Sequence, residues 1–274
     1  IYANSFQGVW IFDDKPNILE NENIQINSLD FKSLKQALHD ENGNLNRPLA
    51  YFSFGINHYF GGLDVFGFHL VNFIIHYLTA IFLFLFIFKT LHLPNLKDNY
   101  ATNAYNIALL SAVFWAISPM HVTAVTYIVQ RMASMAGLFY IMSMYFYLLG
   151  RTEPMRGRQI WFFAVTLFCA VLSFASKQNA IMLPVSIVLY DLLLIQGVNK
   201  SFTKRNLIIA GLPLLFLVLL LFWRLDFSAI LQGYEGRSFT LRERLLTQPR
   251  IIFFYIYQLL YSLQNQLMLL HDVA

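Results

Sequence analysis

Charged residues are scarce in this chain of 274 residues. Asp, Glu, Lys and Arg together make up 12% of it, against roughly 25% in a typical soluble domain. Hydrophobic residues reach 57%, and the mean hydropathy is +0.53. A surface so poor in charge does not suit water on all sides, so lipid must solvate much of the chain. The composition therefore excludes a soluble enzyme and a disordered tail.

Cysteine is almost absent, since Cys169 is the only one, and a single thiol excludes a disulfide scaffold. The sequence also lacks a Gly-rich phosphate loop, a nucleophile elbow and the Cys/His spacing of a zinc site. We therefore predict no nucleotide hydrolase and no zinc site. The net charge of +4 is first a topology signal in a membrane protein, and we predict no nucleic-acid partner from it.

Long apolar runs without charge are frequent. Most are about 17–20 residues long and continuous, which predicts membrane-spanning helices instead of barrel strands. The runs cover residues 70–88, 104–120, 132–149, 159–176, 178–198, 206–223 and 251–270. Pro184 and Pro213 are expected to kink their spans. The last run contains Gln258, Gln264, Asn265 and Gln266, and this polarity favours a partly buried or interfacial helix.

Positive charge is concentrated in three short connections, 89–106, 150–158 and 197–205, which hold eight of the 19 Lys and Arg residues. The positive-inside rule places these connections in the cytoplasm. Residues 1–67 then form a large extracytoplasmic first loop, residues 68–223 the transmembrane bundle, and residues 224–274 an extracytoplasmic basic loop with a final membrane-associated helix. One further helix before residue 1 would fit this alternation, and the side of His271 stays open.

The first loop contains a predicted amphipathic surface helix. Asp30 is a plausible helix start, and Phe31, Leu34 and Leu38 follow at helical spacing, with Lys32 on the opposite face. A second such helix is expected near residues 52–60.

Two adjacent carboxylates, Asp13 and Asp14, lie in the same loop. A carboxylate near the bilayer can act as a general base toward a hydroxyl, or help to hold a metal ion and a phosphate. Acidic pairs are also common in solvated loops that carry no function. No cofactor is predicted with certainty, and a divalent metal ion stays an open alternative.

A polar stripe opens the first span. His69, Asn72 and His76 fall on one helical face at 100° per residue. They line a substrate cavity, or they make hydrogen bonds between helices that need no substrate. No further metal ligands accompany them at a recognisable spacing.

Basic residues also occur on the predicted outer side, against the positive-inside bias. Arg131 and Lys177 stand at outer helix ends, where an Arg and a Lys can hold a lipid phosphate by charge-assisted hydrogen bonds. His121, Arg47 and Arg250 are further candidates for binding the donor. The alternatives are interfacial snorkelling and solvated loops with local ion pairs.

Six segments in this order resemble a known family: FDDKPNI, NRPLAYFSFGINHYFGGLDVFGFHLVNFIIH, SPMHVTAVTYIVQRMASMAGLFY, SKQNAIMLP, LYDLLLIQG and LTQPRIIFFY. The ordered set is similar to the membrane domain of GT-C superfamily glycosyltransferases of the bacterial type linked to tetratricopeptide repeats. That type is in turn similar to the animal transmembrane O-mannosyltransferases. The resemblance covers nearly the whole chain.

The resemblance implies an all-α polytopic membrane protein, with a GT-C-like bundle of about seven transmembrane or interfacial helices in a bacterial inner membrane. It implies a polyprenyl-phosphate-linked sugar as donor and a protein or glycan hydroxyl as acceptor. Asp13 and Asp14 match the catalytic acidic motif, while Arg131 and Lys177 match outer basic positions. His69, Asn72 and His76 match the polar stripe. Membrane lipid and subunits of a membrane complex are the other expected partners.

The chain departs from this family at three places. Many relatives have His-Pro at Ser118-Pro119, Glu at Thr123, and Lys-Glu at Lys177-Gln178. The missing carboxylates favour an alternative in which the chain is a catalytically inactive scaffold or an accessory subunit. A lipid-substrate transporter or polymerase of the cell envelope is a third class, and it would not depend on the Asp pair.

Overall fold

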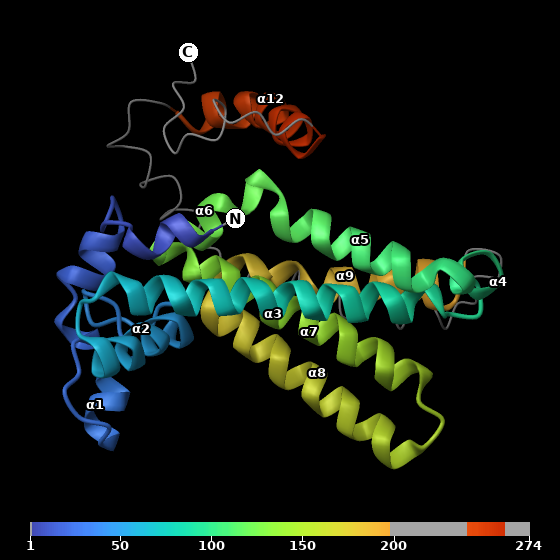
Figure 1. Cartoon of the computed structure of the whole chain (residues 1–274), viewed down its shortest axis with the longest axis horizontal. Coiled ribbons are helices and arrows are strands. Elements are labelled where there is room, and N and C mark those ends of the chain that lie inside the picture. Colours follow the sequence, from blue (N-terminus) through green and yellow to red (C-terminus); the bar gives the residue numbers. More distant parts are fainter. Residues whose placement is uncertain (1, 198–239, 261–274) are drawn as a thin grey trace. The chain divides into compact units, whose positions relative to one another are not determined.

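The computed structural model describes residues 2–197 and 240–260 (Figure 1). Every regular element in this part is a helix, and four helices are long and apolar enough to cross a membrane. The prediction of an all-α polytopic membrane protein is therefore confirmed. The chain divides into two compact units, Ile1–Lys200 and Ser201–Ala274. The domain boundaries expected after residues 67 and 223 stay predictions.

The membrane spans follow the predicted apolar runs. The four candidates are Val65–Leu91 (α3), Ile128–Thr152 (η6, Ile128–Gln130, and α7, Arg131–Thr152), Arg156–Ser176 (α8) and Gln178–Ile195 (η7, Gln178–Met182; α9, Leu183–Tyr190; η8, Asp191–Ile195). The last span is continuous past residue 190, as expected. Pro184 lies in the first turn of α9, where the backbone N–H groups have no partner within the helix, so its missing N–H costs no hydrogen bond. The departure from α-helix is therefore η7, before α9, and Pro184 does not interrupt α9. The predicted run 206–223, with Pro213, lies outside the described residues.

The run 104–120 is not one straight span. α5 (Ala104–Ile117) stops at Ser118, and the chain bends by 51° into η5 (Pro119–His121) and α6 (Val122–Thr126). The cause is Pro119, because proline pushes the residue before it out of the helical region. Ser118 accordingly has φ −60° and ψ 130°. Before α5, the connection contains α4 (Lys97–Tyr100) and η4 (Ala101–Asn103).

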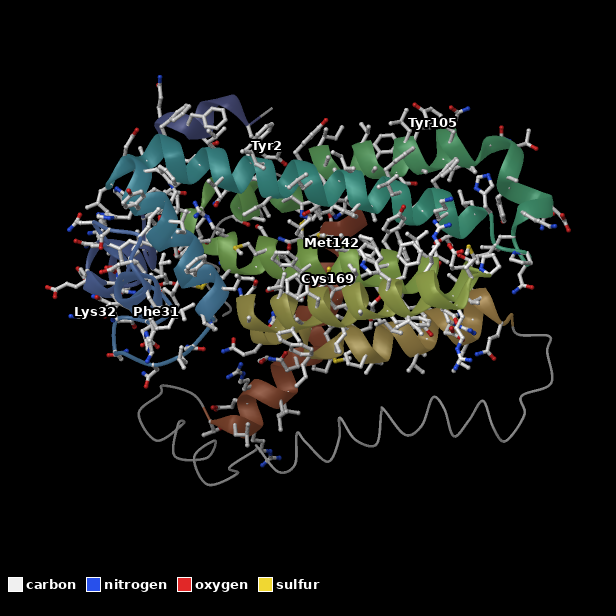
Figure 2. All side chains as sticks on the ribbon, turned by 90° about the horizontal axis from the view of Figure 1, so that it is seen from below. Tyr2, Phe31, Lys32, Tyr105, Met142 and Cys169 are labelled. Atoms are coloured by element: carbon white, nitrogen blue, oxygen red, sulfur yellow. The ribbon has the colours of Figure 1, made fainter. Side chains whose placement is uncertain are left out.

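Figure 1 shows α3, α5, α7, α8 and α9 packed side by side as a bundle. Small residues and hydroxyls hold the α7–α8 pair together, as is usual for helices in lipid. The Ser143 hydroxyl donates to the Thr166 carbonyl at 3.0 Å, and the Ser173 hydroxyl donates to the Ala136 carbonyl at 2.7 Å. Cys169 is buried within this bundle, whereas Tyr105 on α5 is exposed, in agreement with Figure 2.

The N-terminal segment gathers at one end of α3 (Figure 1). Its helices are η1 (Ala3–Gln7), η2 (Lys15–Leu19), η3 (Glu22–Ile24), α1 (Phe31–Gln36) and α2 (Pro48–Gly61). α1 begins as predicted, because the Asp30 carboxylate accepts the backbone N–H of Ser33 at 2.8 Å, but it is only six residues long. Phe31 is 83% exposed on it and stands out with Lys32 in Figure 2.

α2 differs from the surface helix expected near residues 52–60. Tyr51 and Phe54 are buried in a cluster with Phe68 of α3 and Ile128 of η6. α2 is therefore part of the core that joins the N-terminal segment to the bundle.

The second unit contains α12 (Leu241–Leu260), which begins ten residues before the helix predicted over 251–270 and so corrects the predicted loop at residues 241–250. The signal for its start is a capping box, Thr240-Leu-Arg-Glu243. The backbone N–H of Thr240 donates to the Glu243 carboxylate at 2.7 Å, and the N–H of Glu243 donates to the Thr240 hydroxyl at 3.3 Å. Residues 224–239 and 261–274, including His271, lie outside the described residues.

Candidate functional site

The buried member of the acidic pair is Asp14. One oxygen of its carboxylate accepts the backbone N–H of Ile11 at 3.0 Å, and the other accepts that of Val129 at 2.8 Å. Burial raises the pKa of Asp14, while the two N–H donors act in the opposite direction. Because Val129 belongs to η6, Asp14 ties the N-terminal loop to the turn before α7.

The exposed member is Asp13, and its surroundings differ. Its backbone N–H donates to the Tyr127 hydroxyl at 2.9 Å, which fixes the peptide, and its carboxylate is exposed beside the same hydroxyl. Burial raises the pKa of Tyr127, and the negative charges of Asp13 and Asp14 contribute to the rise. Phe12 precedes the pair at φ +41°, a strained conformation for an aromatic residue and one that concentrates at functional sites.

Two cations, Lys177 and Arg47, lie close together near the N-terminal end of α7. The Lys177 ammonium lies 3.5 Å from the Gln130 side-chain oxygen, and Arg47 donates to the Gln178 side-chain oxygen at 3.3 Å. Burial lowers the pKa of Lys177, and the nearby charge of Arg47 lowers it further. Within residues 2–197 and 240–260 neither cation forms an ion pair with a carboxylate. This pair suits an anionic group.

The backbone at Arg47 is also strained, with φ +57° and ψ +50° directly before the Pro48 that begins α2. Phe12 and Arg47 are the two non-glycine residues with positive φ in the described part of the chain. One adjoins the acidic pair and the other belongs to the basic pair. Strain at both places fits positions that the surrounding fold holds for a function.

A cavity of about 220 Å³ lies beside Lys177. Small residues of α7 form much of its lining, among them Ala133, Ala136 and Gly137, together with the ring of Tyr140. Lys177 is the charged residue among those that line it. A largely apolar cavity next to an ammonium group suits a hydrocarbon chain that carries an anionic head.

The turn at η6 connects the acidic pair to the basic pair. On the acidic side, Tyr127 contacts Asp13 and Val129 contacts Asp14. On the basic side, Gln130 contacts Lys177, and the Met132 sulfur accepts from Arg47 at 3.2 Å. At 1.5–2.0 Å rise per residue, Tyr127 and Met132 are about 8–10 Å apart along the chain. A candidate base and a candidate phosphate clamp therefore meet at one short turn, here named the η6 junction (residues 127–132). Sequence reasoning missed Tyr127, Gln130 and Met132, which carry no charge.

The donor-binding role predicted for Arg131 does not fit its surroundings. Arg131 is completely buried, and its guanidinium donates to the side-chain oxygens of Asn72 at 2.7 Å and Asn57 at 2.9 Å, and to the Phe68 carbonyl at 2.9 Å. The Phe54 ring lies 4.7 Å from the guanidinium carbon. Arg131 therefore joins α2, α3 and α7, and has no free face for a phosphate.

The polar stripe of α3 lies on one buried face, as its spacing predicted. Asn72 donates to the Val125 and Ile128 carbonyls at 3.4 and 3.3 Å, and His76 bonds the Ala116 carbonyl at 2.9 Å. Those two side chains thus hold helices together.

The N-terminal segment covers the stripe. The Tyr2 ring packs edge-on against His76 at 5.3 Å, and an added Cβ at Gly8 would lie 2.8 Å from a ring nitrogen of His69. Both ring nitrogens of His69 are buried without a hydrogen-bond partner among the described residues. The alternative of an open substrate cavity along the stripe is not supported.

Two other predicted donor-binding residues lie elsewhere. The His121 ring is 4.4 Å from Trp115 and 5.8 Å from His76, at the bend between α5 and α6. Arg250 lies on α12 in the second unit, and its role stays a prediction. Across the described residues, no three His, Cys, Asp or Glu side chains are grouped to hold a metal ion.

Comparison with curated proteins finds animal protein O-mannosyl-transferases. Protein O-mannosyl-transferase TMTC4 of Mus musculus is 27% identical over 210 residues, which cover 71% of this chain and 28% of that protein. Protein O-mannosyl-transferase tmtc2 of Xenopus laevis is 26% identical over 224 residues, covering 75% and 25%. The chain is similar to the animal protein O-mannosyl-transferases. This confirms the resemblance drawn from the motifs, and membership of the GT-C superfamily stays a prediction.

The same similarity extends to human Protein O-mannosyl-transferase TMTC3, at 26% identity over 204 residues, which cover 72% of this chain and 21% of that protein. The chain thus spans about a quarter of the length of the curated relatives it matches. No family model and no solved structure matches the chain.

Proposed function

We propose that this chain is the membrane part of a glycosyltransferase, which moves a sugar from a polyprenyl phosphate to a hydroxyl of a protein or glycan. The printed names of its relatives support sugar transfer as the class of reaction. The observation that carries the proposal is the η6 junction, a single turn that contacts both Asp13, whose carboxylate is exposed, and two cations that form no ion pair with a carboxylate of the described residues.

Asp13 acts as the general base in this proposal. Its carboxylate takes the proton of the acceptor hydroxyl while the hydroxyl oxygen bonds to the anomeric carbon, and the bond from that carbon to the phosphate oxygen breaks. Attack opposite the leaving group inverts the anomeric centre. Asp13 is chosen over Asp14 because both oxygens of Asp14 already accept backbone N–H groups.

Lys177 and Arg47 hold the lipid phosphate. As the bond to the sugar breaks, the phosphate oxygen gains negative charge, and two cations with free donor capacity stabilise that charge. Such a leaving group needs little protonation, so the mechanism requires no second acid. The cavity beside Lys177 receives the first part of the polyprenyl chain.

The reaction is assigned to the extracytoplasmic side, and the enzyme to a bacterial inner membrane. The concentration of Lys and Arg in the connections at the other end of the bundle supports the side, and the resemblance of the motifs to the bacterial repeat-linked type supports the membrane. Residues 1–67, which carry Asp13, then face the outside, where an acceptor protein or glycan is met.

A catalytically inactive scaffold is the second candidate. The observation that favours it is Gln178, whose amide donates to the Asn46 side-chain oxygen at 2.7 Å and accepts from Arg47. A neutral amide there leaves the basic pair without the carboxylate that the family resemblance predicts at this position. A scaffold of this kind would bind other membrane subunits and would transfer no sugar.

A transfer assay separates the two candidates. The full protein in lipid nanodiscs is incubated with radiolabelled polyprenyl-phosphate sugars and a membrane-protein extract as acceptor. Incorporation should fall at least 100-fold in Asp13→Asn, whereas Glu20→Gln, which neutralises another exposed carboxylate of the same segment, should retain it. Full incorporation by Asp13→Asn contradicts the mechanism, and no incorporation by folded wild-type protein with any donor favours the scaffold.

A further inference from the structure

A second pocket lies at the end of α3 opposite to the acidic pair. α3 has 27 residues and is therefore about 40 Å long at 1.5 Å per residue. The residues at its C-terminal end, the last turn of α7 and the end of η8 line a cavity of about 420 Å³. This volume lies within the range of small-molecule sites, roughly 300–1,000 Å³. The cavity shares no lining residue with the η6 junction.

Three basic residues line this pocket: Lys89, His92 and Arg151. Lys89 forms no ion pair with any residue that the structure describes. His92 places its Nδ1 atom 2.7 Å from the Phe88 carbonyl. Because a carbonyl only accepts, Nδ1 carries a hydrogen, and Nε2 donates to an anion in the imidazolium form, in which both ring nitrogens carry hydrogens. Arg151 uses Nε and Nη2 on Asp191, at 2.5 and 3.2 Å, and keeps Nη1 for another acceptor.

Positively charged residues at helix C-termini also interact favourably with the helix dipole, which is equivalent to about half a negative charge at that end. That explains why Lys89 and Arg151 stand in the last turns of α3 and α7. It does not explain the open space between them. Arg151 and Asp191 form an ion pair with no net charge, so the net positive charge of the pocket comes from Lys89. The Asp191 carboxylate also accepts from Tyr147 at 2.7 Å and Gln196 at 2.5 Å.

The rest of the pocket is apolar and held in place. Leu93, Leu148 and Ile195 contribute to its lining. The Asn95 side chain donates to the Leu194 and Ile195 carbonyls, at 3.1 and 3.0 Å, and so fixes the chain after α3 against η8. A pocket that is cationic on one part and apolar on another suits an amphiphile with an anionic head.

We propose that this pocket binds the phosphate head group of an anionic membrane lipid, independently of the sugar-transfer site. Lys89, Nε2 of His92 and Nη1 of Arg151 contact the phosphate oxygens, and the apolar residues contact the glycerol and the start of the acyl chains. The positive-inside rule assigns this end of the bundle to the cytoplasm. Anionic lipids are concentrated in that leaflet, and basic pockets between membrane helices there bind their head groups.

Calorimetric titration of the full chain in detergent tests the proposal. The probes are dihexanoyl phosphatidic acid, dihexanoyl phosphatidylcholine and inorganic phosphate. Phosphatidic acid should bind at least tenfold more tightly than the other two. The double variant Lys89→Gln/His92→Gln should bind it at least tenfold more weakly. Lys97→Gln removes the same charge in the same connection without lining the cavity, and should bind as the wild type does.

Three results would overturn the inference. The double variant binds as the wild type does, Lys97→Gln loses as much affinity as the double variant, or inorganic phosphate binds as tightly as the lipid. The last result would assign the pocket to a free anion. Lys89→Arg, which keeps the charge, should retain binding and shows that a loss in the double variant reflects charge and not misfolding. Because the pocket lies at the C-terminal end of α3 and shares no lining residue with the η6 junction, none of these outcomes bears on the transfer reaction.

Discussion

Replacing Asp14 by Asn separates a structural carboxylate from a catalytic one. In the wild type both carboxylate oxygens accept a backbone N–H, one from Ile11 and one from Val129. An Asn side chain has one acceptor oxygen, so its NH₂ group must face the other N–H. One charge-assisted hydrogen bond is lost and one buried donor is left unpaired, at about 1–3 kcal/mol each.

Part of this loss is offset, because a neutral amide avoids the burial penalty that raises the pKa of Asp14. We therefore expect Asp14→Asn to lower the free energy of unfolding by about 1–3 kcal/mol. For a chain of this size that is roughly 2–4 °C of Tm per kcal/mol.

The assay is thermal unfolding of the full chain in detergent, followed by the transfer assay below the transition. Asp14→Asn should melt earlier and still transfer sugar at a reduced rate, whereas Asp13→Asn should melt as the wild type does and not transfer. An Asp14→Asn variant with unchanged Tm and no transfer would refute the reasoning and make Asp14 the base.

Three further predictions concern the basic pair and the core. The pKa of Lys177 is lowered from the value of about 10.4 for an ordinary lysine. Donor binding should weaken as the pH rises through this lowered pKa, since the neutral amine no longer attracts phosphate. Lys177→Arg should remove this loss in a binding titration. Gly8→Ala should lower the Tm, since its Cβ would lie 2.9 Å from a backbone carbonyl and 2.8 Å from a histidine ring, while Gly61→Ala, with nothing within 4 Å, should not. Arg131→Met should lower the free energy of unfolding by about 3–5 kcal/mol in a denaturation experiment, since it leaves three buried acceptors unpaired. Arg158→Met breaks the ion pair of the exposed Arg158 with Glu153, at 3.6 Å, and should cost less than about 1 kcal/mol in the same experiment.

The membrane spans could be predicted from sequence because lipid imposes length and apolarity on each of them separately. The runs 70–88 and 159–176 need no knowledge of their neighbours to be recognised as helices. The burial of α2 could not be predicted in this way, since it depends on contacts with Phe68 and Ile128, which are distant in sequence. The start of α12 was predictable from its capping box at Thr240.

The candidate site was predictable as a set of residue types and not as an arrangement. Asp13 and Asp14 are equivalent in sequence, and only the contact of Asp14 with Val129, 115 residues away, distinguishes them. Arg131 and Lys177 are both outer basic residues by position, yet one is a buried link between helices. The phosphate-binding role proposed for Lys177 depends on its closeness to Arg47, which is remote along the chain. Long-range contacts of this kind leave no local pattern to read.

The most direct test of the η6 junction is a single-turnover transfer measurement across a range of donor concentrations. It compares the wild type with Asp13→Asn and with Lys177→Gln. A general base acts on the chemical step, so Asp13→Asn should lower the maximal rate at least 100-fold and leave the donor concentration for half-maximal rate unchanged. Lys177→Gln should raise that concentration at least tenfold. A normal maximal rate in Asp13→Asn, or unchanged donor dependence in Lys177→Gln, would contradict the assignment of base and phosphate clamp to this turn.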